Sequence, residues 1–177
     1  MEHSLGSRLV LGSANFGLNY GLANDRGKLS NKELRQIIKV AEMAGVDTVD
    51  TAQADGDSEP RLGSVLKSHF KIVTKIDVGL SNIYCENSIH NLVSKSLKRL
   101  EVSHLYGVLL HRPELLLGVD GTKIVSELRV LKEKGLIKKI GISIYSPNIL
   151  NEILKLTDLD MIQAPFNVFD QRILSSG

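Results

Sequence analysis

Five polar residues of kinds that often act in catalysis or binding stand at or near the ends of apolar runs: Asp50, Lys75, His111, Ser143 and Gln163. Aspartate, lysine and histidine can exchange protons, while serine and glutamine hold polar groups through hydrogen bonds. Taken singly, such a residue is more often a helix cap or a solvated charge. Parallel α/β folds carry their chemistry at the carboxyl ends of the strands, so recurrence on consecutive runs favours one shared site.

The apolar runs that carry these residues are short and are typical of parallel strands covered by helices. Six strands are predicted, at residues 9–11, 46–51, 72–76, 105–111, 140–143 and 160–164.

Helix signals lie between the predicted strands. Ser30 and Glu33 have the spacing of a capping box, and Gly45 is placed to end the helix that they open. Ser146 followed by Pro147 predicts another helix start. Further helices are predicted at about 59–68, 89–100 and 124–131, and the helix opened by Ser146 at about 146–156.

Regular alternation of strands and helices predicts a parallel sheet with right-handed crossovers. Two architectures fit this alternation, an open doubly wound sheet and a (β/α)8 barrel. The length of 177 residues favours the open sheet, because a barrel normally needs about 250 residues. The absence of a G-x-G-x-x-G or Walker-type motif argues against a nucleotide-binding open sheet.

The composition is that of an ordinary globular protein, with 24% charged residues and a formal net charge of +2. No basic run exceeds two residues, so nucleic acid and acidic membranes are not expected partners. No apolar run is long enough to span a bilayer, and the first residues do not resemble a signal peptide. Cys85 is the single cysteine, which fits the reducing cytoplasm.

A metal site is not predicted. The acidic residues Asp50, Asp55, Asp57 and Glu59 lack the spacing of a calcium loop. The five histidines show no paired metal spacing, and one cysteine cannot build a structural zinc site.

Several longer segments resemble the aldo/keto reductases, a family of (β/α)8 enzymes that use NADPH, in their order and spacing. They are residues 11–17 (LGSANFG), 45–52 (GVDTVDTA), 56–59 (GDSE), 72–75 (IVTK), 109–113 (LLHRP), 139–143 (KIGIS) and 163–167 (QAPFN). The resemblance implies an incomplete (β/α)8 TIM-barrel fold with about six βα units. It favours the barrel over the open sheet.

The resemblance also implies the chemistry. The family transfers a hydride from the nicotinamide to a carbonyl carbon, using an aspartate, a tyrosine, a lysine and a histidine for proton delivery. Asp50, Lys75 and His111 match three of these catalytic residues, and Ser143 and Gln163 match positions that hold the nicotinamide amide of NADP(H). Ile144 stands where the family usually has an asparagine, so one amide contact is expected to be missing.

Position 55 departs from the family pattern, because Asp55 occupies the place of the catalytic tyrosine. An aspartic acid with the ordinary pKa of about 3.9 is protonated in about one molecule in a thousand at pH 7. A carboxylate beside a carbonyl that must become an oxyanion also has the wrong charge. Asp55 is therefore not expected to donate the proton.

Length is the second departure. Residues 1–177 are predicted to form a single aldo/keto reductase-like domain that lacks strands seven and eight, whose loops bind most of the cofactor phosphates in the family. Six of eight strands would leave the first and sixth strands with unpaired edges. Such a chain needs a partner surface, as in self-association through these edges, a distorted closure or a missing continuation.

Two functions follow. The first is NADPH-dependent reduction of an aldehyde or ketone, and residues 17–24 (GLNYGLAN) resemble members that act on sugar derivatives. The alternative is a truncated or catalytically silent relative that binds a small molecule or a partner.

Overall fold

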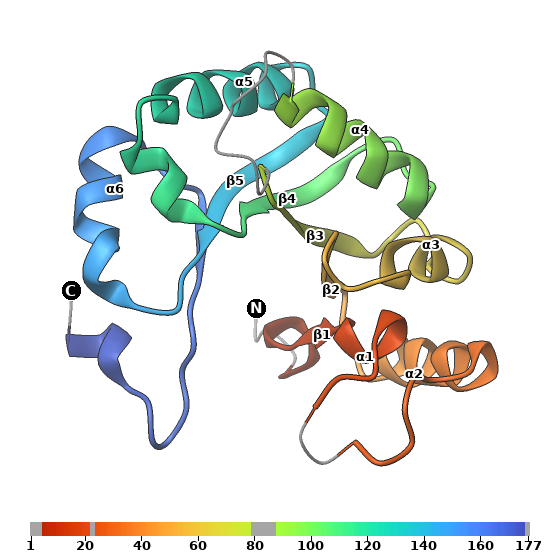
Figure 1. Ribbon diagram of the computed structural model, residues 1–177. Helices are drawn as coiled ribbons and strands as arrows, with labels where there is room; N and C mark the ends of the chain where they lie inside the picture. Colours follow the sequence, from red (N-terminus) through yellow and green to blue (C-terminus); the bar gives the residue numbers. More distant parts are fainter. Residues whose placement is uncertain (1–4, 22–23, 79–87, 176–177) are drawn as a thin grey trace. The chain divides into compact units, whose positions relative to one another are not determined.

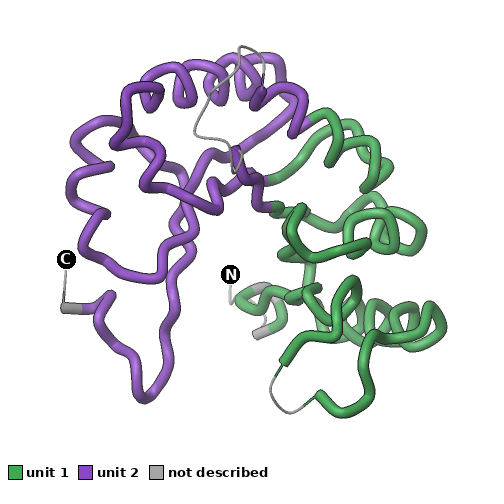
Figure 2. Tube along the Cα trace, viewed as in Figure 1, with its two compact units in different colours: residues 1–74, 94–106 green, residues 75–93, 107–177 purple. Residues whose placement is uncertain are grey.

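The chain is described here from a computed structural model that covers residues 5–21, 24–78 and 88–175 (Figure 1). Cys85 lies outside these residues. The chain divides into two compact units (Figure 2). Unit 1 comprises residues 1–74 and 94–106, and unit 2 comprises residues 75–93 and 107–177.

Six strands form one sheet in the order β1-β2-β3-β4-β5-β6. Their bounds are β1 Val10–Gly12, β2 Thr48–Ala52, β3 Lys71–Ile76, β4 Leu105–Leu110, β5 Ile137–Ser143 and β6 Met161–Gln163. Each strand neighbours the next one in the chain, so the order has no reversal of the kind that defines a doubly wound sheet. This confirms the barrel-type prediction, with six βα units of the (β/α)8 class present.

β1 pairs with β2 in parallel in unit 1, and β5 pairs with β6 in parallel in unit 2. In unit 1, Val10 lies opposite Thr48 and Gly12 lies opposite Asp50. In unit 2, Ser143 lies opposite Gln163, the last residues of β5 and β6. The strand bounds agree with the sequence prediction to within three residues.

Helices alternate with the strands. Their bounds are α1 Ala14–Gly17, α2 Asn31–Met43, α3 Ser58–Gly63, α4 Ser88–Leu100, α5 Gly121–Glu133 and α6 Leu150–Leu156. Short 3₁₀ turns are η1 Leu5–Arg8, η2 Pro113–Leu117, η3 Pro147–Ile149 and η4 Arg172–Ser175.

The capping box of α2 is confirmed. The Ser30 Oγ accepts the Glu33 N–H at 3.3 Å, and the Ser30 N–H donates to the Glu33 carboxylate at 2.8 Å. Gly45 follows the helix with a φ of +77°, a conformation that glycine adopts without steric cost.

Two helix predictions are corrected in detail. The helix expected at 59–68 ends at Gly63. The Ser64 hydroxyl donates to the Arg61 carbonyl, and the Val65 N–H donates to the Leu62 carbonyl, three residues back in the chain. The helix opened by Ser146 begins as the 3₁₀ turn η3 before α6, while the Ser146 cap itself is confirmed by a hydrogen bond from the Asn148 N–H.

Each unit has its own buried apolar side chains. In unit 1 they include Leu34, Ile38, Val49, Leu62 and Ile72. In unit 2 they include Ile89, Leu109, Ile124, Leu128, Ile142 and Ile153. Among the described residues, none of the helices is both long and apolar enough to span a bilayer.

Candidate active site

Unit 1 contains the first two predicted site residues. Asp50 is the third residue of β2 and is half-buried, and its carbonyl accepts the Ser13 N–H at 3.0 Å. Asp55 is half-buried in the turn between β2 and α3, with its N–H bonded to the Ala52 carbonyl and its own carbonyl accepting from Ser58. The β1 loop and the β2 loop are thus tied together beside both acids.

The backbone of Asp55 lies against two glycines. A Cβ on Gly17 would lie 1.8 Å from the Asp55 carbonyl oxygen, and a Cβ on Gly56 would lie 2.5 Å from the Gly17 oxygen. Gly56 also has a φ of +61°. Only glycine at both positions allows this approach, which fixes the backbone at position 55 whatever side chain that residue carries.

Three buried hydroxyls support the same loops. The Ser58 Oγ lies 2.8 Å from the Ser13 Oγ and 3.1 Å from the Thr51 Oγ1. It also lies 3.1 Å from the Ser13 carbonyl oxygen. Because buried polar groups are costly without partners, this cluster stabilises one arrangement of the β1 loop, β2 and α3.

Glu59 is a buried carboxylate at the start of α3, with a relative exposure of 1%. It accepts from the Thr74 hydroxyl at 2.9 Å and lies 3.4 Å from the Arg99 guanidinium. A buried charge needs such partners. Glu59 is therefore a structural anchor of unit 1.

Arg61 connects α3 to the segment that leads into α2. Its guanidinium donates to the Phe16 carbonyl, to the Leu29 carbonyl at 2.5 Å and to the Asn31 side chain at 2.8 Å. Sequence reasoning missed Arg61, because three of its acceptors are separated from it by about 30 or more residues and two are backbone atoms.

Asp57, the last residue of the turn between β2 and α3, forms an ion pair with Lys28 at 2.5 Å. This hydrogen bond from Lys28 lowers the pKa of Asp57 below its ordinary value.

Unit 2 contains the other four predicted site residues. Lys75 is the second-last residue of β3, and His111 directly follows β4; both are half-buried. The His111 N–H donates to the Ile76 carbonyl at 2.9 Å, which aligns the ends of the two strands. The expected hydrogen bond between Lys75 and Asp50 joins residues of different units and stays a prediction.

Ser143 and Gln163 are brought together by the register of β5 and β6. The Ser143 hydroxyl donates to the Gln163 Oε1 at 3.3 Å. A hydroxyl and a primary amide side by side match the donor and acceptor needs of a nicotinamide carboxamide. Ile144 is buried and adds only its backbone N–H, which donates to the Gln163 carbonyl at 2.8 Å.

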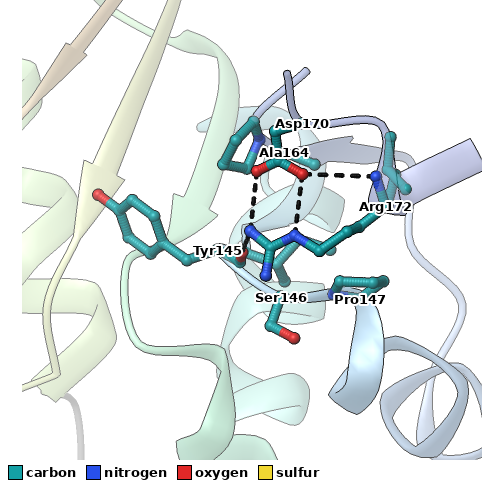
Figure 3. Close-up of a pocket in the computed structure, with 9 residues that line it drawn as sticks. Tyr145, Ser146, Pro147, Ala164, Asp170 and Arg172 are labelled. Atoms are coloured by element: carbon teal, nitrogen blue, oxygen red, sulfur yellow. Dashed lines mark hydrogen bonds and ion pairs between the residues drawn. The ribbon is translucent and has the colours of Figure 1, made fainter. Parts of the chain in front are cut away.

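An ion pair closes a small pocket beside these two residues (Figure 3). The Nε and Nη2 of Arg172 each donate a hydrogen bond of 2.8 Å to the Asp170 carboxylate. The Nη2 also donates to the Tyr145 carbonyl at 3.3 Å. The pocket volume of about 10 Å³ leaves room for no more than a single water. The Arg172 fork lowers the pKa of Asp170 from 3.8 to about 2.

Tyr145 is the aromatic residue at this pocket, and its ring points away from the ion pair (Figure 3). It is 72% exposed, and Tyr20 in unit 1 is also exposed.

Across the part of the chain that the structure describes, histidine, cysteine and acidic residues form no group of three or more that could hold a metal ion.

The sequence model of the Aldo/keto reductase family matches residues 8–176, so the chain belongs to that family. The chain is 32% identical over 149 residues to D-arabinose 1-dehydrogenase of Saccharomyces cerevisiae, covering 78% of this chain and 43% of that protein. It spans about half the length of the curated relatives it matches, between 43% and 51%.

Solved structures agree with this assignment. A structure from Pseudomonas aeruginosa assigned to the aldo-keto reductases has a TM-score of 0.78 at 26% identity, covering 94% of this chain and 66% of that one. The Bombyx mori aldo-keto reductase in complex with NADP has a TM-score of 0.68 at 19% identity, covering 90% and 54% respectively, and supports the fold.

Gly17→Ala is expected to destabilise the chain, because its methyl group would collide with the backbone carbonyl of Asp55. Overpacking of this kind costs about 1–3 kcal/mol. Gly12→Ala is the matched control, since a Cβ there meets nothing within 4 Å. Urea unfolding of both variants measures the difference. Equal stability of the two would contradict the close approach.

The Asp170 carboxyl is expected to titrate near pH 2 in the folded chain. A lowered folded pKa means that the ion pair stabilises the fold above the ordinary value of 3.8 and that this contribution is lost as pH falls from 3.8 towards 2. NMR titration of the carboxyl carbon gives the midpoint. In Arg172→Met the midpoint should return towards 3.8, and an unshifted midpoint in the unmodified chain would refute the fork.

Proposed function

We propose that this chain carries the carbonyl-reduction machinery of an NADPH-dependent aldo/keto reductase. The observation that supports this most is that Lys75, Ser143 and Gln163 occupy the last or second-last positions of β3, β5 and β6, and His111 follows β4. Carboxyl ends of consecutive strands are where barrel enzymes carry their chemistry. The substrate class is an aldehyde or ketone, and a sugar derivative is the specific case that residues 17–24 favour.

The proposed roles divide between proton delivery and cofactor binding. Bound NADPH supplies the hydride. Ser143 and Gln163 hold the nicotinamide amide, and their hydrogen bond to each other supports a preformed site. His111 orients the carbonyl oxygen, while Lys75 assists ionisation of the proton donor and Asp50 holds Lys75.

A specific observation favours a second function, that of a catalytically silent relative that binds without turnover. Asp55 stands in the donor position, on a backbone that Gly17 and Gly56 hold in place. An aspartate of ordinary pKa is ionised at neutral pH, so this residue type supplies a hydrogen-bond acceptor and not a proton donor. The loops for the cofactor phosphates also belong to strands beyond the sixth, so cofactor binding by these residues alone is expected to be weak.

We also propose a cytoplasmic location and self-association. The strand order begins with β1 and ends with β6. Val10 on β1 is 55% exposed, as is Leu9 before it, and Ile162 on β6 is exposed too. In the described sheet, the backbone groups on the outer side of β1 and β6 can pair with strands of another copy, and these exposed apolar side chains can pack beside them.

Asp55→Tyr is expected to restore proton donation only where the cofactor is held. Proton donation contributes about 10²–10⁴-fold in rate. The 177-residue chain is expected to show weak NADPH binding and negligible reduction of a generic aldehyde with either residue at position 55. Fused to the strand-seven and strand-eight segment of a family member, the Asp55→Tyr chain should turn over faster than the Asp55 chain by that factor.

Asp55→Phe is the matched control, since it adds the ring without the hydroxyl. Absorbance at the NADPH band measures turnover, and NADPH fluorescence measures binding separately. Robust turnover by the unmodified chain would refute the assignment of position 55, and Tyr20→Phe and Tyr145→Phe would then locate the donor. NADPH binding unchanged by Gln163→Ala would refute the nicotinamide site.

Self-association is expected to depend on both sheet edges. Replacing exposed Val10 and Ile162 together by lysine should lower the apparent mass towards that of a 19.4 kDa monomer, because edge charges oppose strand pairing. Analytical ultracentrifugation measures this. Val119→Lys, which changes the almost fully exposed Val119 outside the strands, is the control. A monomeric unmodified chain at high concentration would refute the proposal.

A further inference from the structure

Unit 2 contains a cavity that the proposed reaction does not use. It lies between η2, one face of α5 and the end of α6. Its lining residues include Leu116, Thr122, Val125, Ser126, Arg129 and Leu156. Its volume is about 280 Å³. We call it the α5 groove.

The walls of the α5 groove are fixed by backbone packing. A Cβ on Gly121 would lie 1.9 Å from the Leu116 carbonyl oxygen, so η2 and the start of α5 are in direct contact. The Gly121 N–H also donates to the Gly118 carbonyl at 3.1 Å. A groove held in this way exists before any ligand binds, which reduces the entropic cost of binding.

The chemistry of the groove is mixed. Leu116, Val125 and Leu156 supply apolar surface, and the hydroxyls of Thr122 and Ser126 lie on exposed positions of α5. One cation completes the lining, the guanidinium of Arg129.

Arg129 differs from its basic neighbours on α5. Lys123 pairs with Asp120 at 2.8 Å, and Lys132 pairs with Asp160 at 2.6 Å. The Arg129 guanidinium donates to the neutral Thr157 hydroxyl at 3.3 Å, and within residues 5–21, 24–78 and 88–175 no carboxylate pairs with it.

The nearby Glu127 is engaged elsewhere. Its carboxylate accepts the backbone N–H groups of Ile89 and His90 at 3.1 and 3.3 Å, at the start of α4. The guanidinium at the groove therefore keeps donors for an external anion, and a planar fork suits a carboxylate.

We propose that the α5 groove binds a small amphiphilic carboxylate, with its apolar part against Leu116, Val125 and Leu156 and its carboxylate on Arg129. The volume of about 280 Å³ leaves room for the hydrocarbon part of a medium-chain acid. The site is separate from Ser143 and Gln163, so this inference does not depend on the proposed reductase function.

Calorimetric titration of the full chain with octanoate, without NADPH, tests the proposal. Saturable binding is expected, and Arg129→Met should weaken it by roughly ten-fold or more, the usual effect of losing a charge-assisted hydrogen bond. Arg35→Met removes the same charge from α2 and should leave binding unchanged. 1-Octanol, which lacks the charge, should bind more weakly and be insensitive to Arg129→Met.

Ser126→Trp tests the location, because it fills the groove from an exposed position and does not disturb the core. It should abolish binding of both octanoate and octanol. Three results would each overturn the proposal: no saturable binding to the unmodified chain, unchanged octanoate affinity in Arg129→Met, or binding retained by Ser126→Trp.

Discussion

Parallel pairing between strands that follow one another in the chain is the constraint on which the candidate site depends. Parallel neighbours point the same way, so each strand brings its last residues to the same edge of the sheet. The β5–β6 register shows the consequence at atomic level, since it sets Ser143 beside Gln163 although twenty residues separate them in sequence. In unit 2, the parallel pairing of β5 with β6 is therefore what makes neighbours of Ser143 and Gln163.

The loops beyond the strands depend on a different kind of constraint, close contact between backbones. Gly17 and Gly56 allow the β1 loop to touch the turn that carries Asp55, and the Ser13, Thr51 and Ser58 hydroxyls fill the space between them. None of these interactions involves the side chain at position 55. The backbone at position 55 is thus held in place independently of the side chain that this residue carries.

How far the sequence predicts this structure depends on whether a feature is local. The strands and the Ser30 cap were predicted from local periodicity and spacing, and the strand order came from the family motifs. The predicted end of helix α3 at residue 68 was wrong, because the Ser64 hydroxyl donates to the Arg61 carbonyl, an acceptor that a continuing helix would use. The Arg61 bonds and the α5 groove could not be predicted, since each depends on tertiary placement of residues that carry no spacing signal.

The arginines show why residue type alone does not assign function. Arg172 is held in a bidentate fork by Asp170 only two residues away, and this ion pair braces the turn after β6. The Arg61 guanidinium donates its hydrogen bonds to two backbone carbonyls and a side-chain amide oxygen within the chain. Arg129 has a neutral hydroxyl as its described partner and lies at a cavity. The three side chains are chemically identical. Whether an arginine has a structural role or can bind a ligand therefore depends on the acceptors that its guanidinium already has within the chain. Because the acceptor described for Arg129 is neutral, its guanidinium retains charge and donors that suit an anion from solution.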